Sequence, residues 1–209
     1  MKFIRAATFI LLIVVTIYMM WTSDNPKKNL LPVKRYKVTV VTDAPGPWDS
    51  VNAIVFFDIT DEKCVRIAPV IGSEIRPDGI DQEIEMTRVN ENTWEGYFYR
   101  DLVLDENYYG RGVCHWDATQ VAPHFVVHGE SFGTSVWTED ALHKGPQVAY
   151  FRNSDYWDRS YKTYVIHDPS GSTTYLGGGA QDFSTTDPKR IQRPNDFFPI
   201  TVTVKEARP

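Results

Sequence analysis

The pentapeptide Gly129-Glu-Ser131-Phe-Gly133 matches the G-x-S-x-G pattern that exposes a serine nucleophile on a sharp strand-to-helix turn. Acids and histidines that could complete a catalytic triad follow it in the chain: Asp140, His143, Asp155, His167 and Asp168. The turn requires a helix directly after the serine, whereas residues 134–138 are strand-like. We therefore interpret this segment as a turn between strands, and a serine hydrolase using Ser131 remains an alternative.

Three histidines are candidate metal ligands. His124 and His128 are four residues apart, which places both on one face of a strand, and His115 stands beside Cys114. A structural zinc site needs four nitrogen or sulfur ligands, and neither C-x-x-C nor H-E-x-x-H occurs. The acidic loops lack the regular spacing of a calcium loop. We expect no metal and no cofactor.

Aromatic and charged residues alternate in the segment from residue 152 to residue 161. Such mixtures concentrate binding energy at protein interfaces, where a few aromatic and arginine side chains dominate. The contacts that we expect to bind a partner protein are Asp155, Tyr156, Trp157, Arg159 and Tyr161. Trp48, which follows Pro47 and precedes Asp49, is a second candidate. The alternative is a loop that packs its tryptophan onto the domain.

The chain contains two cysteines, Cys64 and Cys114, each within a strand-like run. An even number of cysteines in an oxidising compartment favours a disulfide. A bridge across this loop would stabilise the fold by roughly 3–4 kcal/mol in the chain-entropy treatment. Two buried free thiols are the alternative.

Alternating apolar and polar residues dominate beyond residue 35 and predict strands. The predicted strands cover residues 37–41, 51–58, 82–89, 93–100, 112–119, 123–128, 147–151, 162–166 and 200–205. Helical turns are expected only at residues 138–143 and 102–108. Turn signals rich in glycine and proline separate these runs. The pattern predicts an all-β fold, a two-sheet antiparallel immunoglobulin-like sandwich, with binding residues in the long connections at 152–161 and 168–196.

The first 23 residues predict a membrane anchor. Lys2 and Arg5 precede sixteen uncharged residues that end at Trp21. Tyr18 and Trp21 suit the membrane interface, and residues 4–21 approach the length that spans a bilayer. The bulky exit does not fit a small-residue cleavage site, so retention is favoured over a cleaved signal peptide. A linker at 24–34 and a domain at 35–209 complete the predicted organisation.

The orientation of the anchor follows from competing signals. Lys27, Lys28, Lys34, Arg35 and Lys37 lie after the apolar segment and would hold the domain in the cytoplasm. This preference for basic residues on the cytoplasmic side weakens for long translocated domains, and the first short segment usually decides the orientation. We therefore expect a single-pass protein of the bacterial inner membrane with its domain in the periplasm.

Charge excludes a nucleic-acid partner. The 209-residue chain has a formal charge of −5, and without Lys2 and Arg5 it holds 20 basic and 27 acidic residues. A nucleic-acid-binding domain would instead present a basic face. An acidic domain attracts basic proteins and speeds their capture.

The runs Trp94-Glu-Gly-Tyr-Phe-Tyr-Arg-Asp-Leu and Tyr108-Tyr-Gly-Arg-Gly-Val-Cys114-His-Trp116 resemble segments of small envelope proteins of Gram-negative bacteria. Those proteins are anchored by a helix or a lipid, and some are similar to immunity proteins of secreted antibacterial effectors. The resemblance covers about a quarter of the soluble domain. It implies no catalytic residues, and this chain departs from the lipid-anchored examples because it has no cysteine near its apolar segment.

Together these features predict a membrane-tethered periplasmic protein that binds another protein and catalyses no reaction. The more specific prediction is an immunity protein that neutralises a basic effector toxin. The alternatives are a structural or assembly module of an envelope or secretion machine and, third, the Ser131 hydrolase.

Overall fold

The computed structural model describes residues 26–67, 72–77, 79–159, 164–167, 173–176 and 179–207. Its contacts divide the chain into two compact units. The larger, here called the sandwich unit, comprises residues 33–57, 80–100 and 118–209 as far as they are described. The smaller, the disulfide unit, comprises residues 1–32, 58–79 and 101–117 with the same restriction.

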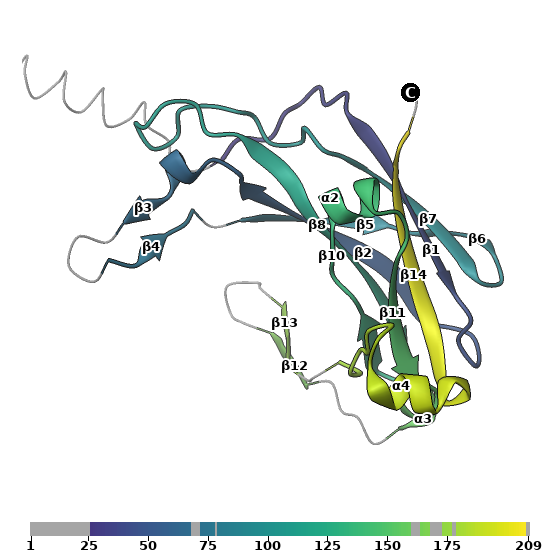
Figure 1. Ribbon diagram of the computed structural model, residues 1–209. Helices are drawn as coiled ribbons and strands as arrows, with labels where there is room; N and C mark the ends of the chain where they lie inside the picture. The colour runs from purple at the N-terminus through teal and green to yellow at the C-terminus, as the bar shows by residue number, and fades with distance from the viewer. Residues whose placement is uncertain are drawn as a thin grey trace, which may run out of the picture. The chain divides into compact units, whose positions relative to one another are not determined.

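The sandwich unit contains two five-stranded antiparallel sheets (Figure 1). The first sheet has the strand order β11 (Gln147–Arg152), β14 (Phe197–Glu206), β1 (Arg35–Thr42), β7 (Thr93–Tyr99) and β6 (Thr87–Asn90). The second has the order β10 (Val136–Trp137), β8 (Trp116–Val127), β2 (Ser50–Ile59) and β5 (Ile80–Glu85), with β9 (Glu130–Gly133) paired to β8. The predicted two-sheet antiparallel sandwich is confirmed.

The core lies between the inner faces of the two sheets. Buried and partly exposed residues alternate along β1, β2 and β14, as expected when one sheet face meets a core. Trp94 of β7 lies with its ring centroid 5.4 Å from that of Phe125 of β8, which joins the two sheets. Phe132 of β9 contacts Phe151 and Phe198 of the first sheet at 5.6 and 5.9 Å. Aromatic rings therefore provide much of the packing between the sheets.

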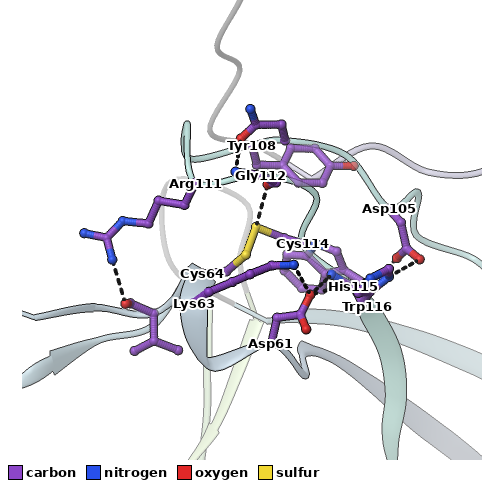
Figure 2. Close-up of a disulfide and its surroundings, with 12 residues drawn as sticks. Asp61, Lys63, Cys64, Asp105, Tyr108, Arg111, Gly112, Cys114, His115 and Trp116 are labelled. Atoms are coloured by element: carbon purple, nitrogen blue, oxygen red, sulfur yellow. Dashed lines mark hydrogen bonds and ion pairs between the residues drawn. A yellow bond between two sulfur atoms is a disulfide. The ribbon is translucent and has the colours of Figure 1, made fainter.

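The disulfide unit is held by the Cys64–Cys114 bond, which confirms the predicted pairing. Cys64 ends the short helix η1 (Glu62–Cys64), and both cysteines are fully buried. The two-residue strands β3 (Arg66–Ile67) and β4 (Glu74–Ile75) pair in this unit. Figure 2 shows Asp61, Asp105 and His115 beside the bond. The described part of this unit has little regular structure, so we expect the covalent link to contribute to its stability.

The predicted strand at residues 82–89 is wrong, because the chain there forms two strands in different sheets. β5 ends at Glu85 and belongs to the second sheet, whereas β6 begins at Thr87 and pairs with β7 in the first. Met86 between them is buried, and a Cβ on Gly96 would lie 2.5 Å from the Met86 sulfur. A glycine at position 96 thus leaves room for the side chain at the crossing point.

Two other predicted boundaries also change. Residues 112–119 and 123–128 were expected to be separate strands, but β8 runs unbroken from Trp116 to Val127 and includes Pro123. The helical turn expected at 102–108 is absent, and the N–H of Cys114 bonds to the Glu106 carbonyl there instead. The helical turn at 138–143 is confirmed as α2 (Thr138–His143).

The two long connections expected to carry binding residues contain short elements. They are α3 (Asn153–Trp157) in the first, and β13 (Thr173–Leu176), α4 (Pro188–Gln192) and η2 (Pro194–Asp196) in the second. Between the two connections, β12 (Tyr164–His167) lies where a strand at residues 162–166 was predicted. β12 and β13 pair with each other as an antiparallel hairpin. Figure 1 shows α3 and α4 close to each other in the sandwich unit, near β11 and β14.

The predicted membrane segment at residues 4–21 lies outside the described residues. Among the helices that are described, none is long and apolar enough to span a bilayer. The predicted linker is described from residue 26 onward. There the Asn29 N–H donates to the Leu102 carbonyl at 2.6 Å, and the Leu104 N–H donates to the Lys27 carbonyl at 2.9 Å. This part of the predicted linker is thus bound to residues 102–104.

Candidate functional site

The two aromatic segments singled out by the sequence lie against each other in the sandwich unit. The Tyr156 hydroxyl of α3 donates a hydrogen bond to the Pro47 carbonyl. The ring centroids of Trp48 and Tyr156 are 5.2 Å apart, and those of Tyr156 and Trp157 are 4.9 Å apart. A Cβ at Gly46 would lie 3.0 Å from the Tyr156 hydroxyl, so any larger residue there would require Tyr156 to shift by a few tenths of an ångström.

Trp48 and Tyr156, both predicted to contact a partner, pack against the core of the sandwich unit, Tyr156 as a buried and Trp48 as a half-buried side chain. Tyr156 is only 1% exposed, and the Trp48 ring contacts Phe125, Phe132 and Phe198 of the core at centroid distances of 4.9 to 6.1 Å. The physical reason is that α3 directly follows the buried end of β11, which directs Tyr156 inward. For this pair, the structure favours the interpretation of aromatic packing onto the domain.

The remaining predicted contact residues differ in accessibility. Trp157 is 55% exposed, Arg159 is exposed, and Asp155 is half-buried. Tyr161 lies outside the described residues. Among the described residues of this segment, Trp157 is the large aromatic side chain exposed to solvent, and the buried Tyr156 packs against its ring. A ring held in this way loses little freedom when it binds.

A cleft of about 490 Å³ lies between α3 and α4. Three cationic side chains line it: Arg152 at the end of β11, and Lys189 and Arg193 in and just after α4. Its other lining residues are Asn153, Ser154, Gln192, Asp196 and Phe197. The formal charge of the lining is therefore +2, in a chain whose net charge is −5.

The local sequence explains why α4 forms beside the cleft. The Asp187 side chain accepts a hydrogen bond from the Lys189 N–H at 2.8 Å, and Pro188 occupies the first helical position. Both are established start signals for helices. Lys189 and Arg193 are four residues apart, which brings their side chains to the same side of a helical turn.

The sequence interpretation missed Lys189 and Arg193. An available signal was Asp187-Pro188, a cap followed by proline, ahead of the basic run Lys189-Arg-Ile-Gln-Arg193. That signal predicts a short basic helix. It does not predict that the helix lies beside Arg152, because that contact joins segments far apart in the chain.

Glu130 of β9 is an unusual buried acid. It is 1% exposed, and its Oε1 atom has no hydrogen-bond partner among the residues that the structure describes. Burial, followed by the nearby charges of Asp155 and Asp158, raises the pKa of Glu130 to about 7. The ionised form of the Glu130 carboxyl group is therefore disfavoured both by burial and by the negative charges of Asp155 and Asp158.

Ser131 is hydrogen-bonded to a histidine, although not to one that the triad pattern suggested. Its Oγ contacts Nε2 of His124, which lies on the neighbouring strand β8. Burial lowers the pKa of His124, which keeps its imidazole neutral near pH 7. Ser131 itself lies within β9 and not on a strand-to-helix turn.

His115, the third candidate metal ligand, is paired with carboxylates in the disulfide unit (Figure 2). Its Nδ1 lies 2.8 Å from Asp105, and its backbone N–H donates to Asp61 at 3.0 Å. The latter bond is the main reason that the pKa of Asp61 is lowered. In the part of the chain that the structure describes, no group of three or more histidines, cysteines or acids could hold a metal ion.

Comparisons of this chain with protein-family models, with curated proteins and with solved structures found no match.

Proposed function

We propose that this protein is a membrane-tethered immunoglobulin-like sandwich that binds another protein through the surface of Asp155, Trp157 and Arg159. In the sharper form of the proposal, it is an immunity protein of the bacterial inner membrane whose periplasmic domain neutralises a basic effector toxin. The resemblance of residues 94–102 and 108–116 to envelope and immunity proteins supports this form. The acidic net charge of −5 supports a basic partner.

The observation that carries the proposal is the exposed ring of Trp157. It is 55% exposed, and it packs edge-on against the buried Tyr156, whose hydroxyl is bonded to Pro47. Tryptophan and arginine are the residues most enriched among side chains that dominate interface energies. Because Tyr156 restricts the ring before binding, little ordering cost would oppose association.

Replacing Trp157 with alanine is expected to weaken binding to the partner by about 2 kcal/mol or more, roughly 30-fold in Kd. The full-length protein is used to capture its partner from membranes, and the affinity of the purified pair is then measured by calorimetry. Trp137→Ala is the matched control, because Trp137 is 58% exposed in β10 and outside this surface. Equal affinities for the wild type and Trp157→Ala would reject the proposed surface.

The identity of the captured partner decides between the forms of the proposal. An immunity role requires that the partner is toxic when expressed alone and that co-expression of this protein restores growth. Capture of envelope or secretion-machine components, without toxicity, would favour the structural or assembly role.

A second candidate function is a serine hydrolase, which the Ser131–His124 contact favours. With its proton on Nδ1, the neutral imidazole can accept the Ser131 proton at Nε2 while Oγ attacks a carbonyl carbon. This function ranks second because Ser131 lies in a strand and lacks the helix that follows an activated serine in the hydrolase turn.

Labelling with a fluorophosphonate tests this candidate. Covalent modification of the full-length protein, lost in Ser131→Ala and kept in Ser135→Ala, is the expected result for a hydrolase. Ser135 is a suitable control because it is exposed and its hydroxyl bonds to Gln120 rather than to a histidine. Absence of labelling in the wild type would remove this function.

A further inference from the structure

The cleft between α3 and α4 concentrates positive charge in an otherwise acidic protein. Arg152, Lys189 and Arg193 line it, and Asp196 is the one acid among its eight lining residues. Among the described residues, no carboxylate lies within ion-pair distance of any of these three cations. With Asp196 counted, the lining keeps a formal charge of +2, so binding of an anion would relieve the repulsion among the three cations.

Arg152 is positioned by an aromatic ring. Its guanidinium carbon lies 4.9 Å from the centroid of the Phe183 ring, and Phe183 packs against Phe197 at 5.0 Å. A cation–π contact of this length restrains the guanidinium, which carries five N–H donors. These donors match the oxygens of a carboxylate or phosphate in pairs. Phe183 thus restrains the side chain of Arg152, which lines the cleft.

The charge of the cleft selects among anions. A lining of +2 is neutralised by a dianion, whereas a carboxylate or a phosphate diester supplies only one negative charge. A phosphate monoester is largely dianionic above its second pKa of about 6 and offers three acceptor oxygens. Gln192 adds a neutral donor, whereas the Ser154 hydroxyl already donates to Asp155, and Phe197 supplies an apolar wall. The volume of about 490 Å³ is within the usual range of small-molecule sites.

We infer that the cleft lined by Arg152, Lys189 and Arg193 binds the phosphate group of a phosphate monoester. The inference is independent of the protein-binding proposal, because it concerns residues that the Trp157 surface does not include. The phosphate can belong to a soluble metabolite or to a lipid headgroup, and both sources present the same dianion to the cleft.

Calorimetry with the full-length protein and phenyl phosphate, at pH 7.5 and low ionic strength, tests the inference. We expect one ligand per chain, with affinity reduced about tenfold by either Arg152→Gln or Arg193→Gln, since each removes a charge-assisted hydrogen bond. Diphenyl phosphate, a monoanion, is expected to bind at least about tenfold more weakly than phenyl phosphate. Glucose 6-phosphate and dihexanoyl phosphatidic acid, compared in the same way, distinguish a soluble from a lipid source.

Arg76→Gln is the matched control. Arg76 is exposed and paired with Glu74 in the disulfide unit, so the substitution changes the net charge equally without touching the cleft. If Arg152→Gln fails to fold, Lys189→Gln in the exposed helix α4 provides the same test, and we expect it to weaken phenyl phosphate binding. Absence of phenyl phosphate binding, equal weakening by Arg76→Gln, or equal affinity for the diester would each overturn the inference.

Discussion

Removing the Cys64–Cys114 disulfide is expected to lower the free energy of unfolding by about 3–4 kcal/mol. The bond closes a loop with a sequence separation of 50 residues, and cross-linking such a loop removes conformational entropy from the unfolded chain. Both cysteines are fully buried, so their replacement by alanine also leaves a small void, which adds to the loss. Urea unfolding of wild type and of the Cys64→Ala/Cys114→Ala variant measures the difference.

A single substitution provides the control for that experiment. Cys64→Ala alone should lose nearly as much stability as the double variant, because either change breaks the same cross-link. Reductant should not affect the double variant. Hydrogen exchange followed by mass spectrometry should rise most in residues 58–67 and 101–117, which belong to the disulfide unit. A loss below about 1 kcal/mol would contradict the chain-entropy account.

Replacing Glu130 with glutamine is expected to remove a loss of stability that the wild type shows between pH 4.5 and pH 8. Relative to wild type, the free energy of unfolding of the variant should therefore be higher by about 3 kcal/mol at pH 8 than it is at pH 4.5. The Glu130 pKa of about 7 in the folded protein stands above the ordinary value of 4.5. The folded state therefore binds more protons than the unfolded state between these values. The contribution of Glu130 is fully present below pH 4.5 and is lost as pH rises to about 7, by at most about 1.4 kcal/mol per pH unit.

Urea unfolding of wild type and Glu130→Gln at several pH values checks this difference. Glu139→Gln is a control for which the pH dependence of stability should have the opposite sign. A hydrogen bond from Arg100 lowers the pKa of Glu139, so its contribution is present above the unfolded pKa and is lost as pH falls. Parallel stability curves for wild type and Glu130→Gln would mean that Glu130 titrates normally.

The sequence correctly predicted the strands, the hairpin and the short helix that depend only on residues close together in the chain. The Val38 and Val40 repeat became β1, the hairpin at 90–93 joined β6 to β7, and α2 formed at the expected residues. Period-2 alternation states which side chains share a face. It does not state which sheet a strand joins, so the change of sheet at Met86 could not be read from residues 82–89.

The candidate site was predictable only in part, because it is assembled from distant segments. The segment from Arg152 was identified by composition, but the inward direction of Tyr156 depends on how α3 follows β11. The contact of Arg152 with Phe183 and the position of α4 join residues that are distant in the chain. The same holds for His124, which pairing of β8 with β9 brings to Ser131 in place of the histidines that follow it.

The position of β14 in its sheet has a consequence for folding kinetics. β14 lies between β1 and β11, and its register places Glu206 opposite Tyr36. The first and last strands of the described chain are therefore neighbours inside one sheet, and such long-range pairings form late and slowly. Until β14 is available, one side of β1 and one side of β11 expose unpaired backbone groups, which are sites for aggregation. Production of this protein should therefore be sensitive to anything that delays delivery of residues 197–206 to the compartment where it folds.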